Sequence, residues 1–335
     1  MIIVVSNRNV APDRTDETIF SDQPNERSLD ELRVAIASYN SGTRDWRVEL
    51  LPEANPTDQI NPPSRVLFYQ VMEDIDAGKL TRDWVFFIHG FNQSFRGSLE
   101  FSRQLEEKYR VNVIVFSWPS NQGGFIADEY RDARQAAKAS SMALDRTLEK
   151  LGRYMHERGV AMLQRRYELQ RSPTVDPNTL PDCRISLNFM AHSLGNYLFE
   201  CFIRTPIFGG ETKIFDNVIL HQADVDISNH AEWVNKINSK RVYATINERD
   251  SVLKASNFVN TARLGNTAEK LNARRSIYMD FTDTRGIGNS HNIFLDVRNS
   301  TVTDFCQSVI TGGRGELVDR FKYDAHTNTY RVDDR

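Results

Sequence analysis

An apolar run that stops at a turn of small residues constrains the fold of this chain most. Residues 185–195 read ISLNFMAHSLG, and a helical pattern of apolar residues follows at once. A strand that turns straight into a helix through a serine is typical of a nucleophile elbow. Larger side chains two positions either side of Ser193 would collide with the neighbouring strand and helix, and Ala191 and Gly195 avoid this. We predict that Ser193 is a nucleophile backed by an anion-favouring helix N-terminus.

Strand-like and helix-like patterns alternate along most of the chain. Residues 84–88 and 111–118 are continuous apolar runs, as strands buried on both faces of a parallel sheet usually are. Residues 126–169 keep apolar side chains on one stripe of a helix. Further strands are predicted at 2–6, 46–51, 218–220, 242–246 and 276–281, further helices at 67–75, 99–109, 194–202 and 233–237, and a hairpin at 320–332. The alternation predicts an α/β fold with a mostly parallel central sheet flanked by helices.

The composition allows one large domain. The chain has 335 residues, of which 40% are hydrophobic, and no repeat, low-complexity tract or clear linker divides it. We therefore expect a single domain over 1–335. Within it we expect strands and a helix at 1–80, a catalytic core at 81–300 and an extension at 301–335.

Charge and cysteine content narrow the class of protein. The formal net charge of -3 gives no electrostatic reason to expect nucleic acid as a partner. No apolar run approaches the roughly 20 residues that span a bilayer, and the first residues lack the features of a secretion signal. Cys183, Cys201 and Cys306 show no metal-type spacing, and no phosphate-loop or metal motif is found, so we expect neither cofactor nor metal. Reduced thiols in a cytoplasmic protein are the simplest interpretation.

A second turn, upstream of the elbow, matches it. The apolar run at 84–88 ends in His89 and Gly90. An oxyanion hole needs two backbone N–H groups aimed at one point, one from the residue after the nucleophile and one from a loop of this kind. We predict that Leu194 and Phe91 supply them. The alternative is an ordinary strand-to-loop turn with a hydrogen-bonded histidine.

The base for such a serine must come later in the chain. A serine needs a base to take its proton, and in this class of fold the order is serine, acid, histidine. Of the four histidines that follow Ser193, His291 is favoured because it lies on a loop after a late strand. His221 lies in or beside a strand as a packed core histidine would, His230 opens a helix that looks exposed, and His326 lies at the tip of the predicted hairpin.

Two carboxylates compete for the role of the acid that fixes the tautomer of the base. Asp250 follows the strand predicted at 242–246, the usual position after the second strand beyond the elbow. Asp224 follows the preceding strand and is the alternative acid, with Asp226 and Glu248 as weaker candidates. A carboxylate at the end of a strand is also often only a helix cap or a surface charge. We favour Asp250.

Aromatic residues follow the predicted strand ends. Phe91, Phe95, Trp118 and Phe125 lie on loops there and can line an apolar pocket for an acyl group. The alternative is that they are ordinary core aromatics. The sequence leaves both interpretations open.

These residues together resemble the α/β-hydrolase superfamily and are most similar to a bacterial branch known as a domain of unknown function. The matching segments are FIHGFN at 87–92, VFSWP at 115–119 and AHSLGN at 191–196, with weaker matches RDSVLKAS at 249–256 and SH at 290–291. The resemblance covers roughly residues 1–296, and it implies Ser193 as nucleophile, Asp250 as acid and His291 as base. The chain departs from the family at Ala191, where glycine is usual, and at residues 222–224 (QAD), where relatives are more apolar.

The resemblance settles no substrate. From the triad and the two turns we expect hydrolysis of an acyl ester or thioester through an acyl-enzyme, with a small acyl molecule as the partner. One alternative is an acyltransferase that uses the same triad. The other is a binding or scaffold protein on the same fold, which the presence of all three triad residues disfavours. Esterases, lipases, thioesterases and peptidases share this frame, so the fold names no substrate.

Overall fold

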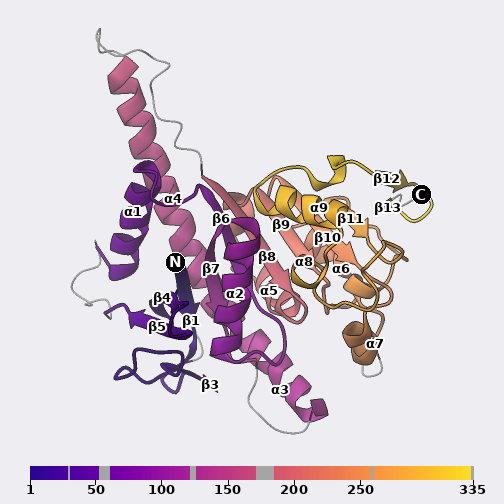
Figure 1. Cartoon of the computed structure of the whole chain (residues 1–335), viewed down its shortest axis with the longest axis horizontal. Coiled ribbons are helices and arrows are strands. Elements are labelled where there is room, and N and C mark those ends of the chain that lie inside the picture. Colours follow the sequence, from indigo (N-terminus) through magenta and orange to yellow (C-terminus); the bar gives the residue numbers. More distant parts are fainter. Residues whose placement is uncertain (29–30, 53–60, 121–125, 171–184, 258–259, 333–335) are drawn as a thin grey trace.

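The computed structural model describes residues 1–28, 31–52, 61–120, 126–170, 185–257 and 260–332. Within these residues, eleven strands form one sheet (Figure 1). Their order across the sheet is β12 (Phe321–Asp324), β13 (Thr329–Val332), β11 (Ser276–Asp280), β10 (Arg241–Ile246), β9 (Asn217–His221), β8 (Ser186–His192), β6 (Asp83–Ile88), β7 (Asn112–Ser117), β1 (Ile2–Ser6), β4 (Arg33–Asn40) and β5 (Asp45–Leu50). Two short strands, β2 (Arg8–Val10) and β3 (Phe20–Pro24), pair separately.

The centre of the sheet is parallel and its edges are antiparallel. Each neighbouring pair from β13 to β1 runs parallel, whereas β12, β4 and β5 pair antiparallel. Parallel strands are covered on both faces, and β6 and β7 are accordingly buried almost throughout. The edge strand β5 alternates instead, with Trp46 and Val48 buried between exposed neighbours. The predicted α/β fold with a mostly parallel sheet is confirmed.

Helices cover both faces of the sheet. They are α1 (Pro63–Asp76), α2 (Phe95–Tyr109), α3 (Ile126–Ala139), α4 (Ser141–Gln170), α5 (Gly195–Ile203), α6 (His230–Val234), α7 (Ser251–Asn257), α8 (Ile293–Asp296) and α9 (Ser300–Ile310), with short 3-10 turns η2 (Glu211–Ile214), η3 (Leu264–Asn266) and η4 (Gly315–Leu317). Successive side chains of a strand point to opposite faces. Phe86 and Ile88 of β6 therefore join the core under α1, α3, α4 and α5, and Val85 and Phe87 join the core under α2, α8 and α9.

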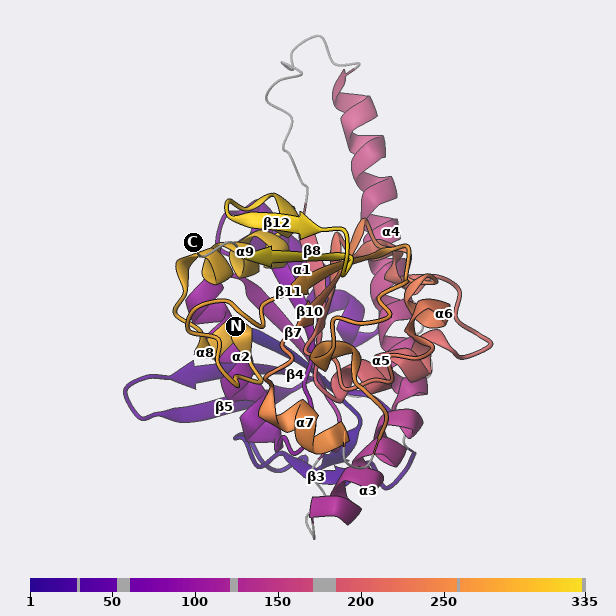
Figure 2. The ribbon, with the colours of Figure 1, turned by 90° about the vertical axis from the view of Figure 1, so that its right-hand side faces the viewer.

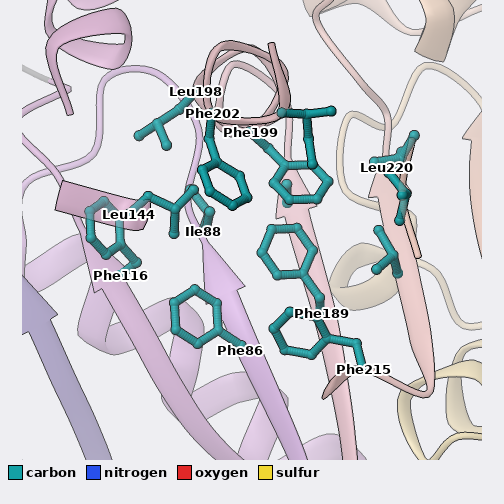
Figure 3. Packing of buried hydrophobic residues seen from close by; sticks show 14 of the residues in the cluster. Phe86, Ile88, Phe116, Leu144, Phe189, Leu198, Phe199, Phe202, Phe215 and Leu220 are labelled. Atoms are coloured by element: carbon teal, nitrogen blue, oxygen red, sulfur yellow. The ribbon is translucent and has the colours of Figure 1, made fainter. Parts of the chain in front are cut away.

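Aromatic side chains fill the space between α5 and the sheet. Figure 3 shows Phe86 and Phe189 of the strands together with Phe199 and Phe202 of α5. The ring centroids of Phe86 and Phe189 lie 5.8 Å apart, and those of Phe189 and Phe199 lie 4.2 Å apart. This packing fixes α5, and with it the turn that precedes α5, to the strand ends.

The long helix predicted at 126–169 is two helices. α3 ends at Ala139 and α4 begins at Ser141, and the far end of α4 extends past the sheet (Figure 2). The Ser140 hydroxyl accepts a hydrogen bond from the Asn7 side-chain amide at 2.8 Å, and the Ser141 hydroxyl donates to the Lys138 carbonyl at 2.8 Å. Serine side chains that bond locally compete with the helical backbone and bend it. The local bond of Ser141 therefore favours the break, and the bond of Ser140 ties the break to Asn7.

Candidate active site

Ser193 occupies the sharp turn between β8 and α5, at the carboxyl ends of the parallel strands. Its φ of 52° lies in the left-handed region, which residues with a Cβ rarely adopt. Such a backbone costs about 1–3 kcal/mol and persists only where its surroundings hold it. The Ser193 N–H donates to the His221 carbonyl, and the Asp224 N–H donates to the Ser193 carbonyl, both at 3.1 Å. A strained serine between a strand and a helix is the backbone geometry of a nucleophile elbow.

Small residues around Ser193 allow the strands and α5 to approach closely. A Cβ on Gly195 would lie 2.6 Å from a carbonyl oxygen of the turn after β6, and one on Gly90 would lie 2.8 Å from the Cβ of Ser193. The buried Asn196 amide donates to the carbonyls of Ala191 at 2.8 Å and Ser193 at 3.1 Å, which locks the turn from within. The turn after β6 therefore lies directly against the turn that carries Ser193.

Gly195→Ala is expected to lower the free energy of unfolding by about 1–3 kcal/mol. The new methyl would meet the carbonyl oxygens of His89 at 2.6 Å and Ile88 at 2.9 Å, and neither can rotate away. The matched control is Gly152→Ala in α4, where the methyl would meet only the Cγ2 of Ile214 at 3.7 Å. Helix propensity should make this control more stable by up to about 1 kcal/mol. Urea unfolding measures both changes, and equal changes would contradict the close approach at the elbow.

Asp250 and His291 are joined by a short hydrogen bond. His291 Nδ1 lies 2.6 Å from Asp250 Oδ2, and the carboxylate is fully buried. The other oxygen, Oδ1, accepts from the backbone N–H groups of Val252 at 2.9 Å and Leu253 at 3.0 Å, at the start of α7. The interpretation of Asp250 as a helix cap therefore describes one of its oxygens, while the other faces His291.

Asp224, the alternative acid, is engaged elsewhere. Its Oδ1 lies 2.9 Å from Nε of the fully buried Arg263 and accepts from the Ser256 hydroxyl at 2.8 Å. Its Oδ2 accepts from the Tyr130 hydroxyl at 2.9 Å. Among the described residues, no hydrogen bond joins Asp224 to a histidine. Its contacts instead tie α3 to α7, which lie at the same end of the molecule in Figures 1 and 2.

The weaker acid candidates also have partners of their own. Asp226 pairs with Arg263 at 2.5 Å and accepts from the Thr261 hydroxyl at 2.5 Å. Glu248 accepts from the Ala268 N–H at 2.9 Å. Of the four carboxylates considered, Asp250 is the one whose hydrogen bond reaches His291.

The other histidines that follow the elbow have structural partners or lie far from it. His221 is fully buried, and its Nδ1 lies 3.0 Å from the Thr245 hydroxyl, as expected of a core histidine. His326 is exposed in the turn between β12 and β13. His230 is buried, with Nε2 2.6 Å from the Tyr278 hydroxyl, so the expectation that its helix is exposed is wrong at this residue.

Three histidine rings lie against one another beside Ser193. The ring centroid of His192 lies 5.0 Å from that of His221 and 4.8 Å from that of His291. Burial and the nearby His291 lower the pKa of His192 to about 3, so its imidazole is neutral. Its Nε2 lies 2.8 Å from the His291 carbonyl oxygen, to which the ring donates when its proton is on Nε2. His192 is not among the residues predicted for the site, because its partner lies 99 positions later in the chain.

The turn after β6 is built around His89, which is fully buried. Its ring stacks on that of Trp118 with centroids 5.6 Å apart, and Nε2 accepts from the Trp118 N–H at 3.2 Å. Nδ1 then carries the proton and donates to the Gly90 carbonyl at 3.0 Å. Burial, and then the nearby Arg8, lowers the pKa of His89 to about 3. The hydrogen-bonded turn histidine foreseen as the alternative therefore describes the His89 side chain.

The two predicted oxyanion donors follow these two turns. In the part of the chain that the structure describes, neither the Phe91 N–H nor the Leu194 N–H donates a hydrogen bond to another group of the protein. The Phe91 side chain is half-buried and packs edge-on against Tyr130, with ring centroids 5.6 Å apart. No contact among the described residues therefore occupies either N–H group.

The other aromatic candidates are packed or lie beyond what is described. Phe95 is 1% exposed and packs against Phe20 with ring centroids 4.9 Å apart. Trp118 is fully buried against His89. Phe125 lies outside the described residues. The alternative interpretation as core aromatics therefore describes Phe95 and Trp118.

The two cysteines in the described part of the chain are not activated nucleophiles, and Cys183 lies outside it. Cys201 and Cys306 are free, and burial raises the pKa of their thiols to about 11 and about 12, which suppresses the reactive thiolate. Among the described residues, no three or more His, Cys, Asp or Glu side chains are grouped to hold a metal ion. No helix in the described ranges has the length and apolar character needed to cross a membrane.

Comparison with known proteins adds one finding. Residues 71–165 match a family described as "Alpha/beta hydrolase of unknown function (DUF900)". The matched segment begins in α1, includes β6 with the turn at His89, and ends in α4, before Ser193 is reached. No curated protein and no solved structure matches the chain. The expected resemblance is confirmed: over residues 71–165 the chain matches an alpha/beta hydrolase family of unknown function, and its mostly parallel sheet flanked by helices is consistent with that fold.

Proposed function

We propose that the protein is a serine hydrolase that cleaves an acyl ester or thioester through an acyl-enzyme. Ser193 is the nucleophile, His291 the general base and Asp250 the acid that orients the base. The observation that carries the proposal is the 2.6 Å contact between Asp250 Oδ2 and His291 Nδ1, next to the strained turn at Ser193. A base oriented by a buried carboxylate beside a serine is the arrangement that activates a hydroxyl. The family match over residues 71–165 supports hydrolase chemistry.

The proposed reaction follows from the tautomer of His291. Asp250 accepts a hydrogen bond from the Nδ1–H group, which leaves Nε2 unprotonated and able to take the serine proton. Ser193 Oγ bonds to the acyl carbon as His291 takes its proton, and the tetrahedral intermediate then expels the alcohol or thiol, to which His291 returns the proton. Water, deprotonated by the same imidazole, attacks the acyl-enzyme and releases the carboxylic acid with Ser193 restored.

The oxyanion of the intermediate needs two fixed donors. We assign the N–H groups of Leu194 and Phe91, which follow the two turns that lie against each other at Ser193 and Gly90. Their lack of a partner within the described part of the chain supports the assignment. Each such donor is typically worth about 3 kcal/mol of activation free energy.

Two features of Ser193 determine what substrate binding must do and how the proposal is tested. Among the described residues, no hydrogen bond joins Ser193 Oγ to His291, and such bonds often form only in the substrate complex. Ser193 is also only 4% exposed. His291 Nε2 must therefore reach Ser193 when substrate binds, while Asp250 keeps its contact with Nδ1, and a small probe is the appropriate test.

A small fluorophosphonate probe is expected to label the protein at Ser193, because such probes react with activated serines. Mass spectrometry of the labelled peptide identifies the site. Ser102→Ala is the matched control: it removes a fully buried hydroxyl that donates only to the Ser98 carbonyl of its own helix at 2.7 Å, and it should leave labelling unchanged. A folded wild-type protein without label at Ser193 would contradict the proposal and favour the scaffold alternative.

The group that accepts the acyl chain distinguishes an acyltransferase from a hydrolase that uses the same residues. A chromogenic ester is assayed with and without an added alcohol or amine. Release of the free acid at an unchanged rate supports hydrolysis. Transfer of most of the acyl group to the added acceptor would reassign the protein as an acyltransferase.

A further inference from the structure

Gln222 lies at the end of β9 in a conformation that is unfavourable for its residue type. Its φ is 40°, in the left-handed region, and its side chain is fully buried. The backbone N–H donates to the Thr245 hydroxyl at 2.9 Å. Strain of this kind costs about 1–3 kcal/mol, persists only where neighbouring contacts hold the residue, and is concentrated at functional sites.

The side-chain amide of Gln222 connects the two residues proposed as acid and base. Its Nε2 donates to Asp250 Oδ2 at 2.6 Å and to the Ser290 carbonyl at 2.7 Å. Its Oε1 accepts from the Ile293 N–H at 3.1 Å. One amide therefore binds the carboxylate and both ends of the short loop that carries His291.

We infer that Gln222 is a positioning residue for the proposed reaction, whose amide fixes the orientation of the Asp250 carboxylate and of the loop that carries His291. The inference rests on the proposed function. Asp250 Oδ2 accepts from Gln222 and faces His291 at the same distance of 2.6 Å. The two donors share one oxygen, so the amide also determines how strongly that oxygen attracts the proton of His291.

Removing the amide donor has a consequence that a structural role would not produce. Without the Gln222 N–H, the negative charge on Asp250 Oδ2 is less stabilised and holds the protonated imidazole more tightly. A general base acts only after it has lost its proton, so the rate of Ser193 acylation rises with pH as this occurs. The rise should therefore move to higher pH when the amide is replaced.

Two substitutions separate loss of the donor from loss of the fold. Gln222→Met keeps the length of the side chain and removes both the donor and the acceptor. Gln222→Glu keeps an oxygen for the Ile293 N–H and places a second carboxyl against Asp250, and because two carboxylates so close do not both ionise, the shared proton can replace the amide donor at Asp250 Oδ2. We expect the second substitution to move the rise less than Gln222→Met does.

Asn188→Leu is the matched control, because Asn188 lies near the amino-terminal end of β8, away from the strand ends that carry the proposed site. Its fully buried amide also makes three hydrogen bonds. It donates to the Ser186 hydroxyl at 3.0 Å and to the Ile310 carbonyl at 2.8 Å, and it accepts from the Asn217 N–H at 3.1 Å. Its loss should weaken the fold about as much as the loss of Gln222, without touching the proposed acid or base.

The experiment measures the rate of fluorophosphonate labelling as a function of pH, together with urea unfolding. Gln222→Met is expected to label up to about 100-fold more slowly near neutral pH, because small misplacements of reacting groups cost this much, with the rise in rate moved to higher pH. Asn188→Leu should keep the wild-type rate and profile.

Two results would overturn the inference while the proposed function stands. One is a folded Gln222→Met protein with the wild-type rate and profile. The other is an equal loss of rate in Gln222→Met and Asn188→Leu with the pH profile unmoved, which indicates a structural role. A wild-type protein that is not labelled overturns the proposed function itself, so the two failures are distinguishable.

Discussion

Replacing Ser193 by alanine is expected to lower the turnover of an activated acyl ester by about a million-fold, because the proposed acyl-enzyme forms on its hydroxyl. The residual rate is that supplied by the oxyanion donors and by substrate binding, which survive the substitution. Alanine adopts a φ of 52° no more easily than serine does. The free energy of unfolding should therefore change by less than about 1 kcal/mol, so that activity and stability separate in this variant.

Ser193→Gly is the matched partner of the alanine variant. It lacks the hydroxyl too, but glycine adopts positive φ without steric cost, so this variant should be more stable than Ser193→Ala by roughly 1 kcal/mol. Ester turnover and urea unfolding are measured for both. Turnover near the wild-type value in either variant would remove Ser193 from the proposed reaction. Equal stability of the two variants would contradict the strain at the elbow.

The parallel centre of the fold was predictable and its edges were less so. β6 and β7 are buried on both faces, and their continuous apolar runs are visible in the sequence. β4 carries polar and small residues, and it becomes a strand by pairing with β1 and β5. α9 is rich in threonine and valine, which favour helix weakly, so its form depends on the burial of side chains such as Phe305 and Cys306.

The sequence predicts which residues gather at the carboxyl ends of the strands better than which of them touch. Neighbouring parallel strands end on the same side of the sheet, so we expect Ser193 after β8, Asp250 after β10 and His291 after β11 to meet there. The structure joins Asp250 and His291. The roles of His192 and Gln222 depend on hydrogen bonds to residues that lie 99 and 28 positions away in the chain. No periodicity or motif records such pairs.

The aromatic candidates illustrate the same limit. Phe95 follows a strand end in the sequence, which fits both a pocket and a core. In the structure its ring packs against Phe20 of β3, a strand in a polar segment without periodicity. A role that depends on a partner from an unpredicted strand is not available to sequence reasoning, whereas the elbow is encoded in five consecutive residues.

Asp250→Asn is expected to lower ester turnover by about ten-thousand-fold. Oδ1 of this residue accepts from the N–H groups of Val252 and Leu253, and an asparagine would keep its oxygen there. Its NH₂ group would then face His291 Nδ1, which could no longer be a donor. The imidazole proton would move to Nε2, the atom that has to accept the proton of Ser193, and the base would be blocked.

Asp224→Asn is the matched control, with the opposite outcome. It should lower turnover by less than about tenfold, as expected when the tautomer of the base is untouched. It removes one of two carboxylates paired with the fully buried Arg263, so the free energy of unfolding should fall by up to about 3 kcal/mol. The measurements are kcat/KM and urea unfolding on both variants. If Asp224→Asn lost turnover and Asp250→Asn kept it, the acid would come one strand earlier, and the 2.6 Å contact of Asp250 with His291 would be structural.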